Sequence, residues 1–184
     1  MAKMQSVMVP LGTNAPEFVL PDTISDKLIK FKDLTSDIAT VVMFICNHCP
    51  FVKHIMPGIV DVARDYLAKD VRFVAISAND VEAYPEDSPA NMKLYAQKEQ
   101  FPFPYLYDAT QEVAQSYHAA CTPDFFIYDG QQTLVYRGQF DDSRPNNHLA
   151  VTGESIREVL DKLLSHQPIS SQQKPSIGCS IKWK

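Results

Sequence analysis

The sequence predicts an α/β protein with a central mixed sheet that carries helices on both faces. Short strands of β-branched and apolar residues alternate with segments whose apolar residues recur three and four apart. The last two predicted strands form a hairpin with no helix between them, which adds an antiparallel part to the sheet. The 184 residues, 45% hydrophobic and 21% charged, suit one domain of ordinary size.

The N-terminal part is predicted to be a β-hairpin that precedes the first core strand. Residues 18–20 and 28–31 are extended segments that flank turn residues at 21–22 and 25–26. Residues 39–44 are mostly apolar and β-branched, as expected of a strand that is covered on both faces. The hairpin is therefore an extension added ahead of the core.

A helix is predicted to begin after Pro50. Pro57 and Gly58 lie inside it, and a proline in a helix interior predicts a kink or a break there. A second buried strand follows at residues 71–77. The apolar face of the helix consists of Val52, Ile55, Met56, Ile59, Val60, Ala63 and Leu67.

The middle of the chain completes the alternating pattern. Residues 78–89 are polar and contain two prolines, so they are predicted to form a loop. A helix is expected at 90–99, a strand at 103–107 and a short helix at 111–117. This order restricts the topology to the few that right-handed crossovers allow.

The C-terminal part is predicted to close the sheet. Residues 124–128 and 133–137 surround a turn at 129–132 and form the hairpin, and residues 154–165 form the last helix.

A tail follows this closing helix. It is polar and contains proline, but residues 177–183 are too apolar for a free segment, so we expect it to dock. The predicted organisation is one domain, residues 1–166, with a docked tail, residues 167–184.

Charge and hydropathy exclude several classes of function. The 17 Lys and Arg against 22 Asp and Glu give a net charge of −5, which argues against a protein that mainly grips nucleic acid. The longest apolar run is far shorter than the about 20 residues of a membrane-spanning helix. The N-terminus also lacks the apolar core of a signal peptide, so we expect a cytoplasmic protein that binds no membrane.

The four cysteines, at 46, 49, 121 and 179, need a chemical explanation because a chain this long folds without disulfides. Cys46-Asn47-His48-Cys49-Pro50 follows a buried strand and opens a helix, where unpaired N–H groups and a partial positive charge favour a thiolate. His48 adds positive charge, and Pro50 suits the first helical position. In a reducing compartment such a CxxC pair is typical of a redox-active or metal-binding site.

A second motif, Cys121-Thr122-Pro123, lies just ahead of a predicted strand. A proline there fixes the backbone and cannot donate to a sheet. If the Thr122–Pro123 bond is cis, the Thr122 backbone faces outward and can pair with an extended peptide. The alternative is an ordinary loop proline.

Together the element order and the two motifs resemble the thioredoxin superfamily over most of the chain. The extended N-terminus and the insertion after the second core strand look like its peroxiredoxin and TlpA-like branch. The segments CNHCPFVKH, RGQFDDSRP and PSIGCSIKW are similar to an uncharacterised peroxiredoxin-like group. The resemblance implies a thioredoxin-like fold.

The resemblance also implies roles for site residues. Cys46 matches the attacking cysteine of thioredoxins, Cys49 matches the resolving cysteine, and Pro123 matches the active-site cis-proline. We therefore expect thiol–disulfide exchange, in which His48 tunes the redox potential and Thr122 helps to orient the incoming chain. In peroxiredoxins the peroxide-reactive cysteine falls on Cys49, which makes a thiol peroxidase the alternative. In the same alignment the peroxiredoxin threonine is Cys46 here, the peroxiredoxin proline is Val42, and the position of the supporting arginine falls near Pro123. The groups that polarise a peroxide are therefore missing.

Two further hypotheses concern the remaining cysteines. Cys121 and Cys179 either pass electrons to the pair as a relay or are ordinary buried cysteines. A second alternative is a metal-binding or redox-sensing module, in which the four thiols hold zinc or an iron–sulfur cluster with His48 as a spare ligand. The spacing lacks a second CxxC, so no metal and no other cofactor is expected.

The expected partners follow from thiol–disulfide exchange. They are a protein or small-molecule disulfide substrate and a thiol electron donor. The other polar residues of interest, His54, His118, His148, Arg137 and Asp141-Asp142, are interpreted as surface or core residues, with Arg137 and the two aspartates on a solvated edge.

Overall fold

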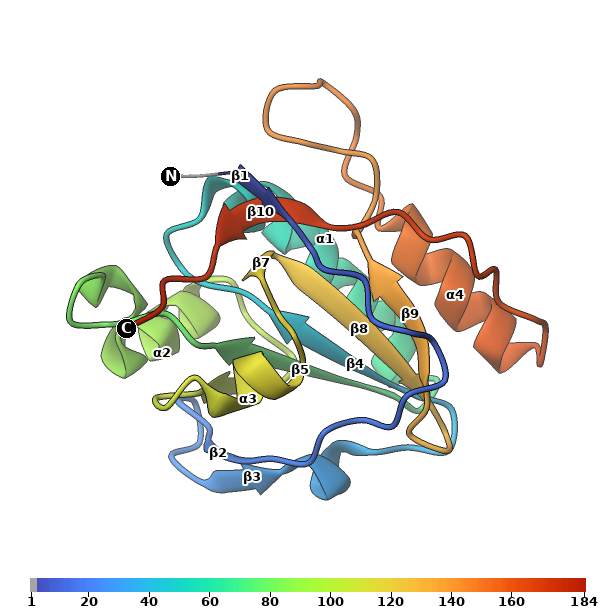
Figure 1. Ribbon diagram of the computed structural model, residues 1–184, viewed down its shortest axis with the longest axis horizontal. Coiled ribbons are helices and arrows are strands. Elements are labelled where there is room, and N and C mark those ends of the chain that lie inside the picture. The colour runs from blue at the N-terminus through green and yellow to red at the C-terminus, as the bar shows by residue number, and fades with distance from the viewer. Residues whose placement is uncertain (1–2) are drawn as a thin grey trace.

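A five-stranded mixed sheet forms the centre of the computed structural model, which describes residues 3–184 (Figure 1). The strand order is β6-β5-β4-β8-β9. Strands β4, β5 and β6 run parallel, whereas β8 is antiparallel to both β4 and β9. The predicted mixed sheet is confirmed. Its strands are β4 (Ala39–Phe44), β5 (Val71–Ser77), β6 (Tyr105–Tyr107), β8 (Asp124–Asp129) and β9 (Leu134–Gly138).

Helices cover both faces of this sheet, as predicted, but unequally. The long helices α1 (Pro50–Leu67), α2 (Pro89–Lys98) and α4 (Glu154–Leu164) share one hydrophobic core with the sheet. The short helix α3 (Glu112–Ser116) and the N-terminal segment pack on the opposite face. Alternate residues of β4 point into the two cores, with Val41 on the first side and Val42 on the second. The CxxC motif opens α1, on the larger core.

A kink or a break was predicted at Pro57, and helix α1 does not break there. The proline ring lies on the exposed side of the helix, while the neighbouring Met56 and Ile59 are buried. Packing of this buried stripe holds the helix together across the missing backbone donor. Gly58 also lies against the loop after β9, because a β-carbon there would come within 2.7 Å of the Val151 side chain.

The predicted N-terminal hairpin is present as β2 (Val19–Pro21) and β3 (Leu28–Lys30). It is followed by the short 3₁₀ helix η1 (Phe31–Leu34). Phe31 is fully buried and packs against the ring of Phe18, with the ring centroids 5.4 Å apart. The hairpin therefore seals the face of the sheet that the long helices leave uncovered.

The tail docks as predicted, and it does so as a strand that the sequence pattern does not reveal. Strand β10 (Ile177–Ser180) lies between β1 (Lys3–Gln5) and β7 (Cys121–Thr122) in a small antiparallel sheet (Figure 1). Hydrogen bonds between Ser6 and Ser176 continue the pairing of β1 with the tail. The first and last strands of the described chain thus lie together beside the start of α1.

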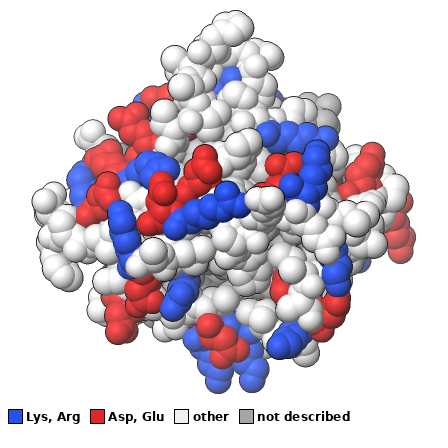
Figure 2. All heavy atoms as spheres, turned by 180° about the vertical axis from the view of Figure 1, so that it is seen from behind, with Lys and Arg blue, Asp and Glu red and all other residues white. Residues whose placement is uncertain are grey.

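The segment at 78–89 is more ordered than the predicted loop. It contains the 3₁₀ helix η2 (Pro85–Asp87), and Asp87 is fully buried. No helix among residues 3–184 is long and apolar enough to cross a membrane. On the face drawn in Figure 2, acidic and basic side chains are interspersed. The electrostatics of the cysteine site therefore depend on the groups that lie close to it.

Candidate redox site

The two cysteines of the CxxC motif lie at the junction between β4 and α1, as the sequence predicts. The backbone N–H of Ile45, just after β4, donates to the carbonyl oxygen of Ile76 and so extends the sheet to the edge of the motif. Cys49 is the N-cap residue of α1, and Pro50 occupies its first turn. Cys46 and Cys49 are free thiols and both are buried.

Cys46 lies on the side of the motif that faces a carboxylate. Its sulfur is 3.3 Å from the hydroxyl oxygen of Thr122. The sulfur, one nitrogen of His48 and one oxygen of Asp87 lie within 4.8 Å of one another. The hydrogen bond that the Cys46 thiol donates to Cys49 raises the pKa of Cys46 well above its usual value, and burial and the Asp87 charge raise it further. Cys46 is therefore protonated at neutral pH.

Cys49 lies at the N-terminal end of α1, where its sulfur faces the C-terminal tail. It is 3.2 Å from the carbonyl oxygen of Thr122 and 2.9 Å from the sulfur of Cys179. The hydrogen bond from the Cys46 thiol lowers the pKa of Cys49 most. Burial opposes this effect, but the Cys179 thiol and the Val52 N–H support it, and the pKa falls to about 5. Of the two thiols of the pair, Cys49 therefore has the lower pKa.

Thr122 and Pro123 meet both cysteines, and their peptide bond is cis. The hydroxyl of Thr122 contacts Cys46 and its carbonyl contacts Cys49. The backbone of Thr122 pairs with an extended segment, as the sequence suggested, and the segment that occupies this edge is β10 of the same chain. Ser176 adds a hydrogen bond from its hydroxyl to the Pro123 carbonyl oxygen, at 2.7 Å.

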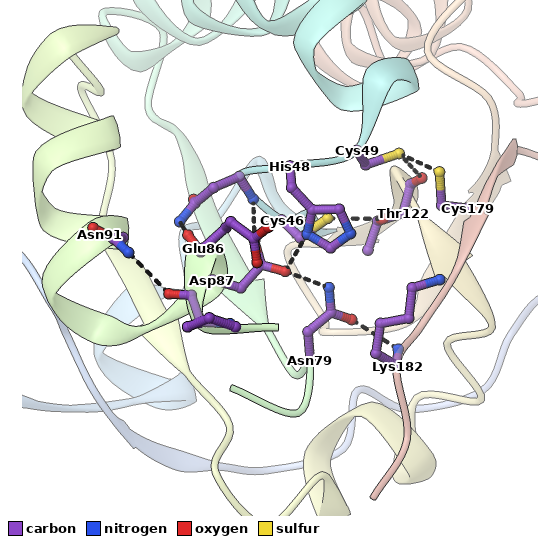
Figure 3. A network of polar contacts seen from close by, with 12 residues as sticks. Cys46, His48, Cys49, Asn79, Glu86, Asp87, Asn91, Thr122, Cys179 and Lys182 are labelled. Atoms are coloured by element: carbon purple, nitrogen blue, oxygen red, sulfur yellow. Dashed lines mark hydrogen bonds and ion pairs between the residues drawn. The ribbon is translucent and has the colours of Figure 1, made fainter. Parts of the chain in front are cut away.

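Asp87 organises the loop between the two cysteines, a role that no sequence pattern predicts (Figure 3). Its carboxylate accepts hydrogen bonds from the backbone N–H of Asn47 at 2.8 Å and from Asn79 at 2.7 Å. The Nδ1 atom of His48 lies 2.6 Å from the same carboxylate, and the His48 ring stacks on Tyr84. His48 is thus held by Asp87, beside Cys46. Asp87 follows a second acidic residue, Glu86, in a short segment between two prolines, and such a segment carries no periodic signal that predicts burial.

The structure brings one of the two candidate relay cysteines into the site. The sulfur of Cys179 touches that of Cys49, as described above, and Figure 3 shows it beside Thr122. Burial raises the pKa of Cys179 to about 12, and its hydrogen bond to Cys49 adds to this effect. The Cys121 thiol points instead to the carbonyl oxygen of Pro123, at 3.6 Å, and burial raises its pKa.

The alternative of a four-thiolate metal site is not supported, because the Cys121 thiol points to the Pro123 carbonyl oxygen and not to the other three sulfurs. Among residues 3–184, the group with suitable spacing is Cys46, His48 and Asp87. Both oxygens of Asp87 already accept hydrogen bonds from Asn47, His48 or Asn79, so the carboxylate is satisfied without a cation. The hydrogen bonds to Asp87 therefore account for the arrangement of Cys46, His48 and Asp87 without a metal ion.

Arg137 does not lie on a solvated edge, so that interpretation is wrong. Its side chain is fully buried and forms an ion pair of 3.0 Å with the buried Asp124. It also donates to the carbonyl oxygen of His118 and lies over the ring of Phe126. Burial raises the pKa of Asp124 to about 6 against the opposing effect of Arg137. The apolar surroundings of β8 and β9 exclude water from this pair.

The two aspartates after β9 have different environments. Asp141 is buried and accepts hydrogen bonds from the backbone N–H groups of Ser143, Thr152 and Gly153. It therefore orders the loop that leads to α4. Asp142 is exposed and pairs with Lys174, as expected of a solvated residue.

Comparison with known proteins identifies the family. Residues 11–137 match the model of the AhpC/TSA family. No curated protein matches the chain. An uncharacterised conserved protein from Geobacillus kaustophilus is 60% identical, with a TM-score of 0.99 over 100% of this chain and 97% of that one.

Two further solved structures have the same fold. A hypothetical protein from Sinorhizobium meliloti 1021 is 44% identical, with a TM-score of 0.95 over 98% of both chains. A putative thiol:disulfide interchange protein DsbE from Chlorobium tepidum is 18% identical, with a TM-score of 0.68 over 85% of this chain and 99% of that one. The chain therefore belongs to the AhpC/TSA family, in the peroxiredoxin-like branch of the thioredoxin superfamily, and it has a thioredoxin-like fold.

Proposed function

We propose that the protein is a thiol–disulfide oxidoreductase whose redox pair is Cys46 and Cys49. The observation that carries this proposal is the placement of two free thiols at the strand-to-helix junction, where both contact Thr122 ahead of the cis Pro123. The hydrogen bond between the two thiols supports it, because it lowers the pKa of Cys49, at the N-terminal end of α1, and raises the pKa of Cys46. A thiolate next to a protonated thiol is the arrangement needed for attack on a disulfide followed by release.

The electrostatics favour Cys49 as the attacking sulfur and Cys46 as the resolving one, the reverse of the order that the resemblance implies. The Cys49 thiolate attacks one sulfur of a substrate disulfide, and the other substrate sulfur leaves as a thiolate. In the resulting mixed disulfide Cys49 no longer carries a charge. The hydrogen bond that raised the pKa of Cys46 is then lost, so Cys46 ionises more easily.

The second half of the cycle completes the electron transfer. The Cys46 thiolate attacks Cys49, the Cys46–Cys49 disulfide forms, and the second substrate thiol leaves. Two electrons have then passed to a protein or small-molecule disulfide, and a thiol electron donor restores the reduced pair. His48 and Asp87 are positioning residues in this scheme, because they hold the backbone between the two cysteines.

Mixed-disulfide trapping tests the roles of the two thiols. The Cys46→Ser and Cys49→Ser variants are made in a Cys179→Ser background, so that Cys179 cannot displace an adduct on Cys49. Both are treated with an aromatic disulfide reagent, and the adducts are mapped by mass spectrometry. We expect both variants to lose catalytic insulin reduction, and only Cys46→Ser to accumulate a stable adduct, on Cys49. The Cys121→Ser variant is the matched control, because that buried thiol faces a carbonyl oxygen outside the pair.

Two outcomes would contradict this scheme in different ways. An adduct on Cys46 in the Cys49→Ser variant, with none on Cys49 in the Cys46→Ser variant, restores the order that the resemblance implies. Full insulin reduction by either variant refutes the redox pair.

A second candidate function is a thiol peroxidase that reacts through Cys49. The lowered pKa of Cys49 favours it, because a peroxide reacts with the thiolate. Against it, no Lys or Arg side chain of residues 3–184 is a hydrogen-bond partner of the Cys49 sulfur. A variant that lacks both Cys46 and Cys179 should form Cys49 sulfenic acid far faster than free cysteine does if this function is correct. A rate like that of free cysteine excludes it.

A further inference from the structure

Strand β10 occupies the edge at which an extended substrate would pair. Cys179 lies opposite Thr122, and Ser180 lies opposite Cys121, in antiparallel register. This is the geometry of β-strand addition, in which backbone hydrogen bonds align a segment and its side chains enter neighbouring sites. The side chain placed at the site in this way is a thiol, 2.9 Å from the Cys49 sulfur.

Gly178 makes this close approach possible. A β-carbon at Gly178 would collide with the carbonyl oxygen of Thr122, which also contacts Cys49. Any other residue would push the strand away from the site. The glycine immediately before Cys179 thus fits the tail to the cis-proline segment at the place where the two sulfurs meet.

The rest of the tail is fixed to the loop of the motif. Asn79 donates to the carboxylate of Asp87 and accepts a hydrogen bond from the backbone N–H of Lys182, at 2.9 Å (Figure 3). The carbonyl oxygen of Lys182 accepts from the N–H of Asp80 and from the side chain of Gln111. Both sides of Cys179 are therefore anchored, and the docked strand covers the redox pair.

We propose that β10 is a built-in substrate of the site, and that Cys179 exchanges with the Cys46–Cys49 disulfide. This inference rests on the proposed function, which leaves that disulfide after each turnover. The Cys179 thiolate attacks the Cys49 sulfur, a Cys49–Cys179 bond forms, and the Cys46–Cys49 bond breaks. Cys46 leaves as a thiolate and takes up the proton that Cys179 released, so the oxidation state of the protein is unchanged.

The exchange fastens the tail over the site, and reduction by the thiol donor releases it. In the reduced protein the thiolate on Cys49 opposes ionisation of Cys179. That charge is absent once Cys49 is in a disulfide, so Cys179 becomes a better nucleophile when there is a bond for it to attack. External substrate reaches Cys49 only when β10 leaves the edge, because both thiols of the pair are buried beneath it.

Disulfide mapping of the full chain tests the exchange. The reduced protein is oxidised with oxidised glutathione, quenched in acid, alkylated and digested with trypsin. Cys46 and Cys49 share one tryptic peptide and Cys179 lies on another, so a Cys49–Cys179 bond appears as a cross-linked pair. We expect this pair beside the Cys46–Cys49 form in the wild type and as the main disulfide in Cys46→Ser. Cys121→Ser should match the wild type.

The Gly178→Ala variant tests the docking without removing a thiol. We expect the cross-linked fraction to fall at least about tenfold, because overpacking at this contact displaces the strand. Insulin reduction should rise as the edge opens. The single tryptophan, Trp183, follows the strand, so acrylamide should quench its fluorescence more strongly in Gly178→Ala than in the wild type.

The outcomes separate this inference from the proposed function. If the Cys46–Cys49 disulfide forms and insulin is reduced, but the cross-linked pair is absent from both the wild type and Cys46→Ser, the tail is not a substrate and the redox pair stands. Unchanged quenching and insulin reduction in Gly178→Ala also overturn the inference. If no Cys46–Cys49 disulfide forms, the proposed function itself fails.

Discussion

Two buried carboxylates, Asp87 and Asp124, flank the cysteine site, and their charges are compensated in different ways. Asp87 and Asp124 are both fully inaccessible to solvent. Asp87 accepts hydrogen bonds from the motif loop and from Asn79, whereas Asp124 pairs with Arg137 and has the backbone N–H groups of Ala120 and Phe125 beside it. The first carboxylate holds a loop that carries chemistry, and the second joins two strands of the sheet.

The difference shows how the cost of burying a charge is met. Several donors on Asp87 share its charge, so it can act on Cys46 without destabilising the fold. The pKa of Asp124 rises to about 6 because burial outweighs the attraction of Arg137. In addition, two nitrogen atoms of Arg137 have no hydrogen-bond partner among the described residues. The Asp124–Arg137 ion pair therefore compensates the buried charge less completely than the donors around Asp87 do, and its contribution to stability depends more strongly on pH.

The largest expected effect comes from breaking that pair. Replacing Arg137 with Met removes the ion-pair partner of the buried Asp124, whose carboxyl must then be buried as an unpaired charge or take up a proton, so we expect a loss of about 3–5 kcal/mol at pH 7. Urea unfolding followed by circular dichroism measures the loss. The conservative Arg137→Lys variant should recover part of it.

The pH dependence of this loss has a definite sign. The pKa of Asp124 is raised in the folded chain from 3.8 to about 6. Between these values the folded chain binds a proton that the unfolded chain does not, so the stability contributed by this group increases as the pH falls. Arg137 lowers this pKa, so in Arg137→Met the pKa of Asp124 rises further and the folded variant holds a proton near pH 7 that the wild type has lost. The loss in Arg137→Met should therefore be smaller at pH 5 than at pH 7. An equal loss at both values would contradict the assignment to Asp124.

An intermediate effect is expected from Asp87→Asn, which sharpens the contrast. The amide presents a donor where His48 or Asn79 needs an acceptor, so stability should fall by about 1–3 kcal/mol. Removing the charge should also lower the pKa of Cys46, which the Asp87 carboxylate raises along with the hydrogen bond to Cys49 and burial. Thiolate absorbance at 240 nm, followed against pH, should show the second thiolate appearing at lower pH.

The matched control for Asp87→Asn is Asp142→Asn, an exposed carboxylate paired with Lys174. Its effect on stability should stay below about 1 kcal/mol, and the thiolate titration should not move. A titration that is the same in Asp87→Asn as in the wild type would show that Asp87 acts on position alone.

The smallest effect is expected from Tyr84→Leu. The Tyr84 ring stacks on His48 with centroids 5.5 Å apart and an angle of 7° between the planes. Its loss should cost about 0.5–1.5 kcal/mol, because the contacts of Asp87 remain. Urea unfolding and the thiolate titration measure the two quantities. A loss of stability as large as that of Arg137→Met would mean that the stacking of Tyr84 on His48, and not the Asp87 carboxylate, holds the loop between the two cysteines.

The sheet could be predicted because its strands are encoded locally. The strands expected at 39–44 and 71–77 have those bounds in the structure, since each is a continuous apolar run between helical segments. The strands of the small sheet, β1, β7 and β10, were not expected. Each has two to four residues and forms only through pairing between distant parts of the chain.

The same limit applies to the site. The strand-to-helix position of Cys46 and Cys49 follows from local sequence. Which of them ionises does not, because the groups that decide it include Asp87 and Cys179. Cys179 is 130 residues away from its contact with Cys49. A contact between residues so far apart in the sequence leaves no periodic pattern. The position of the thiols can therefore be predicted from the sequence, but their relative pKa values depend on the tertiary structure.

The placement of β10 has a consequence for the newly made protein. All five strands of the central sheet precede residue 139, and the cover of the redox pair is made last, by residues 177–180. A chain synthesised only as far as residue 139 contains every strand of the central sheet, but it lacks the strand that pairs with β1 and places Cys179 against Cys49.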